Sequence, residues 1–254
     1  MGFTNSPLVT YTKLSPNHSG QRNHAIDTIT IHCVVGQCSV EVLGSIFAPE
    51  SRQASSNYGV GYDGRIGMYV EEKNRSWCTS SATNDHRAVT IEVASDMSAP
   101  YAVNEKAFAA LLDLVTDICK RNKIKKLVWS TNKSDRVNHK NGCNLTVHRD
   151  YANKSCPGDY LYERHDEIVA EVNKRLGVET TSAPEPFKPY LVKVTASALN
   201  IRRGAGTNYN VAGVIRNKGV YTIVAEKAGQ GSKKGWGKLK SGAGWISLDF
   251  CDKK

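Results

Sequence analysis

Residues 145–158 read Leu-Thr-Val-His-Arg-Asp-Tyr-Ala-Asn-Lys-Ser-Cys-Pro-Gly, a short apolar run followed by a polar loop and a Pro-Gly turn. His148 ends the apolar run, which predicts a strand, and Cys156 follows eight residues later. A loop of this length can fold back and bring an imidazole and a thiolate together. Because these are two ligand types that zinc prefers, the stretch predicts one side of a metal site.

A third ligand is available on another predicted strand, residues 28–35. Polar and apolar side chains alternate along it, and His32 falls on the polar face with the threonines. Three protein ligands would leave one position for water, as in a catalytic zinc site. Spacing alone leaves the alternative open, because a histidine at a strand end and a buried cysteine are more often structural.

The rest of the first 177 residues alternates strands and helices. Further strands are predicted at 57–62, 65–70 and 88–94, and helices at 104–123 and 160–176. Asp63-Gly64 is a two-residue hairpin signal, and Gly177 is a helix stop. We therefore expect an α/β domain over residues 1–177, with a mixed central sheet flanked by helices.

The composition and the predicted secondary structure of the chain change near residue 178. Residues 178–189 hold three prolines among small polar residues and predict a linker. Residues 190–254 hold short β-like segments separated by Gly, Asn, Ser and Lys, with no sustained helical period. This last part predicts a small all-β barrel.

The net charge is concentrated in that C-terminal part. The chain of 254 residues has 34 Lys and Arg against 24 Asp and Glu, a net charge of +10. Residues 1–177 hold 21 basic and 19 acidic residues, whereas residues 190–254 hold 12 and 3, a net charge of +9. Such a surplus indicates an anionic partner. Without an arginine-rich helix or zinc-finger spacing, nucleic acid is not expected, and no apolar run approaches the roughly 18 residues of a membrane span.

Several separated motifs resemble the type 2 N-acetylmuramoyl-L-alanine amidases, whose fold includes the peptidoglycan recognition proteins. The motifs are Ile29-Thr-Ile-His32, Thr146-Val-His-Arg-Asp150 and Asn153-Lys-Ser-Cys-Pro-Gly158. Segments 15–24 and 156–162 resemble the amidase lysins of phages that infect Gram-positive bacteria. The resemblance covers about residues 10–177. It implies a zinc-dependent enzyme that cleaves the amide bond between N-acetylmuramic acid and L-alanine of the peptidoglycan stem peptide.

Carried over by position, the resemblance implies that His32, His148 and Cys156 bind Zn²⁺. It implies that Glu92 takes a proton from the attacking water and passes one to the leaving amine. Lys154 would stabilise the oxyanion of the tetrahedral intermediate. Tyr58 matches a tyrosine that lies near the zinc in parts of the family.

Each of these roles has an alternative. Glu92 could be an exposed strand carboxylate, Lys154 a solvated loop lysine and Tyr58 a packing residue. The sequence departs from many relatives at Cys33, where they carry a histidine; strand alternation turns Cys33 away from His32, so we expect a core thiol. The remaining histidines are expected at surface or supporting positions: His18, His24, His86, His139 and His165.

Residues 190–251 resemble a bacterial SH3-like domain. The similarity lies in Val194–Gly213 and in the later segments around Trp236 and Trp245. It implies binding to cell-wall peptides or polymers, which would hold the enzyme on insoluble peptidoglycan. Trp236, Trp245 and Tyr209 could form the binding groove or the core of the barrel. Anionic wall polymers would be attracted by the positive charge of this part.

These observations predict a phage endolysin that causes lysis of the bacterial cell. Because the first residues carry no recognisable secretory signal, we expect synthesis in the host cytoplasm and action on the wall after release. The alternatives are a non-catalytic peptidoglycan-binding protein, a bacterial autolysin and a cell-wall recycling amidase. Cys156 argues against a non-catalytic binding protein. The missing export signal argues against an autolysin, and the wall-binding part argues against a recycling amidase.

Overall fold

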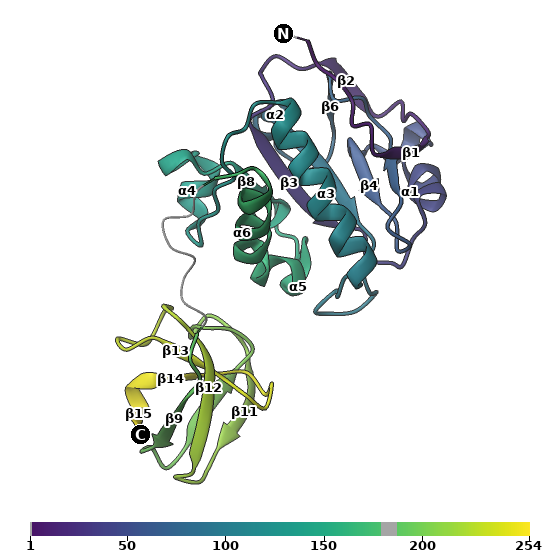
Figure 1. Cartoon of the computed structure of the whole chain (residues 1–254). Helices are drawn as coiled ribbons and strands as arrows, with labels where there is room; N and C mark the ends of the chain where they lie inside the picture. The colour runs from purple at the N-terminus through teal and green to yellow at the C-terminus, as the bar shows by residue number, and fades with distance from the viewer. Residues whose placement is uncertain (1, 179–186) are drawn as a thin grey trace. The chain divides into compact units, whose positions relative to one another are not determined.

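The computed structural model describes residues 2–178 and 187–254 (Figure 1). The chain divides into two compact units, Met1–Thr180 and Thr181–Lys254. Most of the predicted linker, residues 178–189, lies outside the described residues. Within the described residues, no helix is both long enough and apolar enough to span a bilayer.

The first unit is built on a six-stranded mixed sheet in the order β1-β5-β4-β7-β3-β8. The antiparallel pair is β4 with β5, and the other neighbours run parallel. Its strands are β1 (Val9–Thr12), β3 (Thr28–Cys33), β4 (Tyr58–Val60), β5 (Ile66–Met68), β7 (Ala88–Val93) and β8 (Leu145–Val147); β2 (His18–Gln21) and β6 (Asn74–Ser76) form a separate ribbon. The predicted mixed sheet is confirmed.

Helices flank this sheet (Figure 1). They are α1 (Val40–Phe47), α2 (Ala82–Arg87), α3 (Glu105–Arg121), α4 (Lys133–Val137), α5 (Gly158–Glu163) and α6 (His165–Arg175). The helix predicted over 160–176 is therefore two helices. The prediction was wrong there because Arg164, with φ −95° and ψ 4°, leaves the helical conformation and ends α5.

Strand alternation gives the sheet one apolar and one polar face. The apolar side chains of β3 and β7 pack with those of α3 in one core cluster, which includes Ile31, Ile91 and Leu111. On the other face the threonines are linked by hydrogen bonds: Thr30 Oγ1 lies 2.7 Å from Thr146 Oγ1. Asn84 of α2 bonds to both. His32 and Glu92 share the polar face, so the site is built there.

The second unit is a seven-stranded antiparallel sheet in the order β11-β10-β14-β13-β12-β9-β15. Its strands are β9 (Tyr190–Val194), β10 (Leu199–Arg202), β11 (Val211–Ile215), β12 (Val220–Lys227), β13 (Trp236–Leu239), β14 (Trp245–Ser247) and β15 (Cys251–Lys253). This all-β unit has its own apolar core, as the sequence predicts, and is consistent with an SH3-like domain. Trp236 and Trp245 are 2% and 8% exposed, so both are buried, but they lie on the face of the sheet opposite the apolar cluster that includes Leu239 and Ile246.

Candidate active site

The structure brings His32, His148 and Cys156 together. His32 lies near the carboxyl end of β3, and His148 directly follows β8, the parallel neighbour of β3. Cys156 lies in the turn before α5, and its Sγ is 3.3 Å from His32 Nδ1. The two imidazole rings meet edge to face with centroids 5.1 Å apart, and one ligand atom from each of the three residues lies within 4.8 Å of the other two.

This donor set fits zinc. With Zn–S and Zn–N bonds of about 2.3 and 2.0 Å, a tetrahedral ion separates its sulfur and nitrogen ligands by about 3.5 Å. The observed 3.3 Å between Cys156 Sγ and His32 Nδ1 needs only a small adjustment. Burial holds the pKa of His32 well below its usual value and also lowers that of His148. Both imidazoles are therefore neutral, which is the form that binds a metal.

Hydrogen bonding fixes the orientation of these ligands. Ser80 Oγ lies 3.3 Å from His148 Nε2, a contact that helps to position the ring. Cys33 is buried in the core, as predicted, yet its thiol also hydrogen-bonds with Cys156. This hydrogen bond and burial raise the pKa of the Cys156 thiol. A bound cation would oppose that shift, because it stabilises the thiolate.

Glu92 lies beside His32, one of the three candidate ligands. Its backbone pairs in register with His32 across β7 and β3, so the two side chains project from the same face. Glu92 Oε2 is buried and has no hydrogen-bond partner among the described residues. Burial raises the pKa of Glu92 to about 7. The carboxylate is thus a partly buried group aimed at the site rather than an exposed strand residue.

Lys154 lies on the exposed loop that leads to Cys156. Its positive charge is near enough to His148 to lower the pKa of that imidazole further, after the effect of burial. The structure therefore places the predicted lysine at the edge of the site with its side chain in solvent.

Tyr58 does not join this group. It pairs with Ile91 rather than with Glu92, so its side chain projects from the apolar face of the sheet into the core. There its hydroxyl donates to Glu72 Oε1 at 2.7 Å and accepts from the backbone N–H of Ser6 at 2.8 Å. This position fits the packing alternative, and we assign Tyr58 no role in catalysis.

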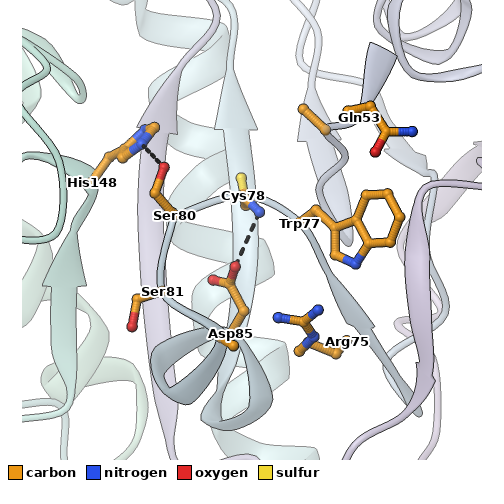
Figure 2. Close-up of a pocket in the computed structure, with 10 residues that line it drawn as sticks. Gln53, Arg75, Trp77, Cys78, Ser80, Ser81, Asp85 and His148 are labelled. Carbon is orange, nitrogen blue, oxygen red and sulfur yellow. Dashed lines mark hydrogen bonds between the residues drawn. The ribbon is translucent and has the colours of Figure 1, made fainter. Parts of the chain in front are cut away.

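A cavity of 470 Å³ lies beside His148 (Figure 2). Its wall includes Arg75 of β6, Trp77 and Cys78 from the segment between β6 and α2, and Gln53 on the side of Trp77. Asp85 anchors this segment, because its carboxylate accepts from the backbone N–H of Cys78 at 3.1 Å. Sequence reasoning missed these residues, although Trp77 is an aromatic residue in a region without a clear helix or strand pattern.

Comparison with known families assigns most of the first unit to one family. Residues 22–159, more than half of the chain, match the family model described as N-acetylmuramoyl-L-alanine amidase. The chain belongs to this amidase family. The matched residues include His32, Glu92, His148 and Cys156, so the site of this amidase lies within the family region.

Several solved structures are similar to this amidase. N-acetylmuramoyl-L-alanine amidase LysC from Clostridium intestinale is 20% identical, with a TM-score of 0.44 over 65% of this chain and 95% of that one. A mutant endolysin from Bacillus subtilis is 16% identical, with a TM-score of 0.47 over 64% and 97%. A selenomethionine derivative of AmpD is 14% identical, with a TM-score of 0.49 over 66% and 99%. No curated protein sequence matches the amidase.

Proposed function

We propose that this amidase is a zinc-dependent endolysin that cleaves the bond between N-acetylmuramic acid and L-alanine of the stem peptide. One observation carries the proposal: two neutral imidazoles and a thiol converge, with a partly buried carboxylate beside His32 and with His148 lining an adjacent cavity. This combination suits hydrolysis of an amide, a reaction that needs an activated water and a proton donor for the leaving amine.

His32, His148 and Cys156 would hold the ion. Two neutral imidazoles and one thiolate leave the bound site a net charge of +1. When bound, Zn²⁺ would polarise the scissile carbonyl and acidify water. Ser80 keeps His148 in the orientation that binding requires, through its contact of 3.3 Å with Nε2.

Glu92 and Lys154 would handle the protons and the developing charge. Glu92 accepts a proton from the attacking water and delivers one to the nitrogen of L-alanine as the bond breaks. Its carboxylate suits both steps, because burial brings its pKa near neutrality. Lys154 extends its ammonium from the loop before Cys156 and stabilises the oxyanion.

The cavity beside His148 would bind the substrate. Trp77 offers an apolar ring surface for the sugar or the peptide, and Arg75 offers a guanidinium for a carboxylate of the stem peptide. Both residues are held in place by Ser19, to which Trp77 Nε1 donates at 2.6 Å and Arg75 Nη2 also donates.

The second unit would hold the enzyme at the bacterial wall. We assign residues 1–177 to catalysis, 178–189 to a linker and 190–254 to an SH3-like wall-binding domain. The 12 basic and 3 acidic residues of the last part suit anionic wall polymers. Tethering raises the local concentration of the catalytic unit at its insoluble substrate. Its place of action is the cell wall.

Digestion of purified cell walls tests the proposed reaction. New alanine amino groups without new reducing ends are expected, and mass spectrometry should show stem peptides that begin with alanine. New reducing ends without alanine amino groups would indicate a glycosidase instead. Binding without any cleavage would indicate a non-catalytic peptidoglycan-binding protein.

The Cys156→Ser variant tests the metal ligands. It should lose about one equivalent of zinc together with the amidase activity. Cys143→Ser is the matched control, because Cys143 is buried elsewhere and its Sγ donates to the backbone oxygen of Val128 at 3.4 Å, a bond that serine can also make. A Cys156→Ser variant that keeps both its zinc and its activity would reject the ligand assignment.

A further inference from the structure

Cys78 faces the candidate active site, and the mechanism above does not use it. Its Sγ lies 4.0 Å from Glu92 Oε1. Together with one ring nitrogen of His32, these groups place three ligand atoms within 4.8 Å of one another. Thiolate, imidazole and carboxylate are the protein ligands of Zn²⁺. The polar face of the sheet thus holds a second donor set that shares His32 with the first.

Two buried atoms of this second set have no hydrogen-bond partner among the described residues. They are Nε2 of His32 and Oε2 of Glu92. His32 is completely buried, and its other nitrogen, Nδ1, contacts Cys156. An unpaired buried polar atom costs free energy, which makes each such atom in a native fold evidence for a missing partner. A cation between these groups would be bound by Nε2 of His32 and by one or both oxygens of the Glu92 carboxylate.

The spacing and the charges of the set also suit a cation. A tetrahedral zinc ion separates its sulfur and oxygen ligands by about 3.6 Å, so the 4.0 Å between Cys78 and Glu92 needs a shift of only a few tenths of an ångström. The second set supplies two anionic ligands, the Cys78 thiolate and the Glu92 carboxylate, where the first set supplies only the Cys156 thiolate. A second divalent ion would therefore be neutralised locally.

We propose that His32, Cys78 and Glu92 form a second binding site for a thiophilic divalent cation of the Zn²⁺ class. His32 bridges the two sites, with Nδ1 toward the first ion and Nε2 toward the second. On binding, Cys78 and His32 would each release one proton to solvent, and so would the protonated fraction of Glu92. The two ions then carry a charge of +4, which is balanced by the Cys156 and Cys78 thiolates, the Glu92 carboxylate and the His32 imidazolate.

Occupation of this second site would switch the enzyme off. A carboxylate bound to a cation no longer accepts a proton, so Glu92 could not serve as the base. The loss of activity rests on the proposed function, because it requires Glu92 to be the catalytic base. The existence of the second binding site does not rest on that function. Excess zinc should therefore inhibit the amidase, although the first equivalent activates it.

Zinc titration of the metal-free full-length protein tests the site. Equilibrium dialysis should give two equivalents of tightly bound zinc for the wild type and for the Cys143→Ser control, and one for Cys78→Ser. One equivalent in the wild type, or two in Cys78→Ser, would overturn the proposal. Titration of the wild type with Co²⁺ needs no variant: the thiolate-to-cobalt charge-transfer absorption should rise over two equivalents, and a rise that ends at one would also overturn it.

Activity during the same titration tests the inhibition. Release of alanine amino groups should rise with the first equivalent and fall at least tenfold with the second. For Cys78→Ser, activity relative to its own value at one equivalent should not fall. Two bound equivalents with full activity would overturn the assignment of Glu92 as a ligand. Two bound equivalents with no release at any zinc level would reject the proposed function and leave the second site standing.

Discussion

Arg136 and Asp150, which follows His148 by two residues, form a buried bidentate ion pair. Arg136 Nε and Nη2 donate to the two carboxylate oxygens at 2.7 and 2.6 Å, and each side chain is 2% exposed. The guanidinium also lies over the Trp129 ring, 4.5 Å from its centroid. Because Asp150 ends the short 3-10 turn that begins at His148, the pair fixes the backbone that carries this proposed ligand.

Removing the charge of Asp150 should therefore destabilise the first unit. Asp150→Asn leaves Arg136 charged and buried without its partner, which typically costs about 3–5 kcal/mol. Urea denaturation followed by tryptophan fluorescence measures the loss. Asp159→Asn is the control, because Asp159 is 57% exposed and its contact with Arg149 is 3.3 Å, so about 1 kcal/mol or less is expected. Equal losses in the two variants would contradict a structural role for the buried pair.

Replacement of Glu92 should separate turnover from metal binding. Glu92→Gln keeps the shape of the side chain but removes its ability to take a proton, so the amidase rate should fall by about 10²–10⁴-fold. The zinc of the His32, His148 and Cys156 site should remain. Glu50→Gln, at an exposed position, is the control. Unchanged wall lysis by Glu92→Gln would remove Glu92 from the mechanism.

Lys154 should act on the transition state. Lys154→Met should lower kcat by about 10²–10³-fold with little change in KM, because an oxyanion forms only as the reaction proceeds. Lys154→Arg keeps the charge and should recover part of the rate. Lys140→Met removes another lysine from the same unit and serves as control. A rise in KM without a fall in kcat would assign Lys154 to substrate binding instead.

The sequence predicted the parts of the site that lie on regular strands. Alternation along β3 and β7 placed His32 and Glu92 on polar faces, and the structure pairs these two residues in register. Tyr58 belongs to β4, a strand of three residues, which is too short for its facing to be read from periodicity. Its pairing with Ile91 is a tertiary contact that no local pattern encodes.

The residues of the cavity wall were not predicted from the sequence, for a related reason. Trp77 and Cys78 lie between β6 and α2 in an irregular segment, which is positioned by hydrogen bonds to Asp85. Such bonds join residues without a fixed sequence period. The break at Arg164 likewise changes the helical phase, and His165 lies buried against the Trp129 ring.

Buried His165 should make the first unit sensitive to acid. Its Nδ1 donates to the backbone oxygen of Leu161 at 2.7 Å, while Nε2 has no partner among the described residues, and burial lowers its pKa from 6.5 to about 4. As the pH falls, His165 therefore takes up a proton at a higher pH in the unfolded chain than in the folded protein. The contribution of neutral His165 to the free energy of unfolding is complete above pH 6.5 and is lost as the pH falls toward 4. The loss amounts to about 3 kcal/mol.

The His165→Phe variant tests this linkage. Phenylalanine keeps a ring against Trp129, whose centroid lies 4.2 Å from that of His165, but cannot take up a proton. Its free energy of unfolding should fall less steeply between pH 6.5 and 4 than that of the wild type. His24→Gln, at an exposed position, should keep the wild-type slope. Parallel pH profiles for wild type and His165→Phe would assign the acid sensitivity to other groups.

Wall binding by residues 190–254 should depend strongly on salt. This part has its own apolar core and a net charge of +9, from 12 basic and 3 acidic residues. Raising the ionic strength from about 0.01 M to about 1 M shortens the screening length from about 30 Å to about 3 Å, so we expect binding to isolated walls to weaken at least about tenfold.

A double variant connects that salt dependence to one loop. The backbone N–H groups of Lys233 and Lys234 donate to Asp249 at 2.8 and 2.7 Å, so the loop keeps its anchor when both side chains become glutamine. Lys233→Gln/Lys234→Gln should bind more weakly at low salt and show a shallower salt dependence. Walls depleted of anionic polymers should bind both proteins equally. Binding that does not change with salt would leave the positive charge without a role in wall attachment.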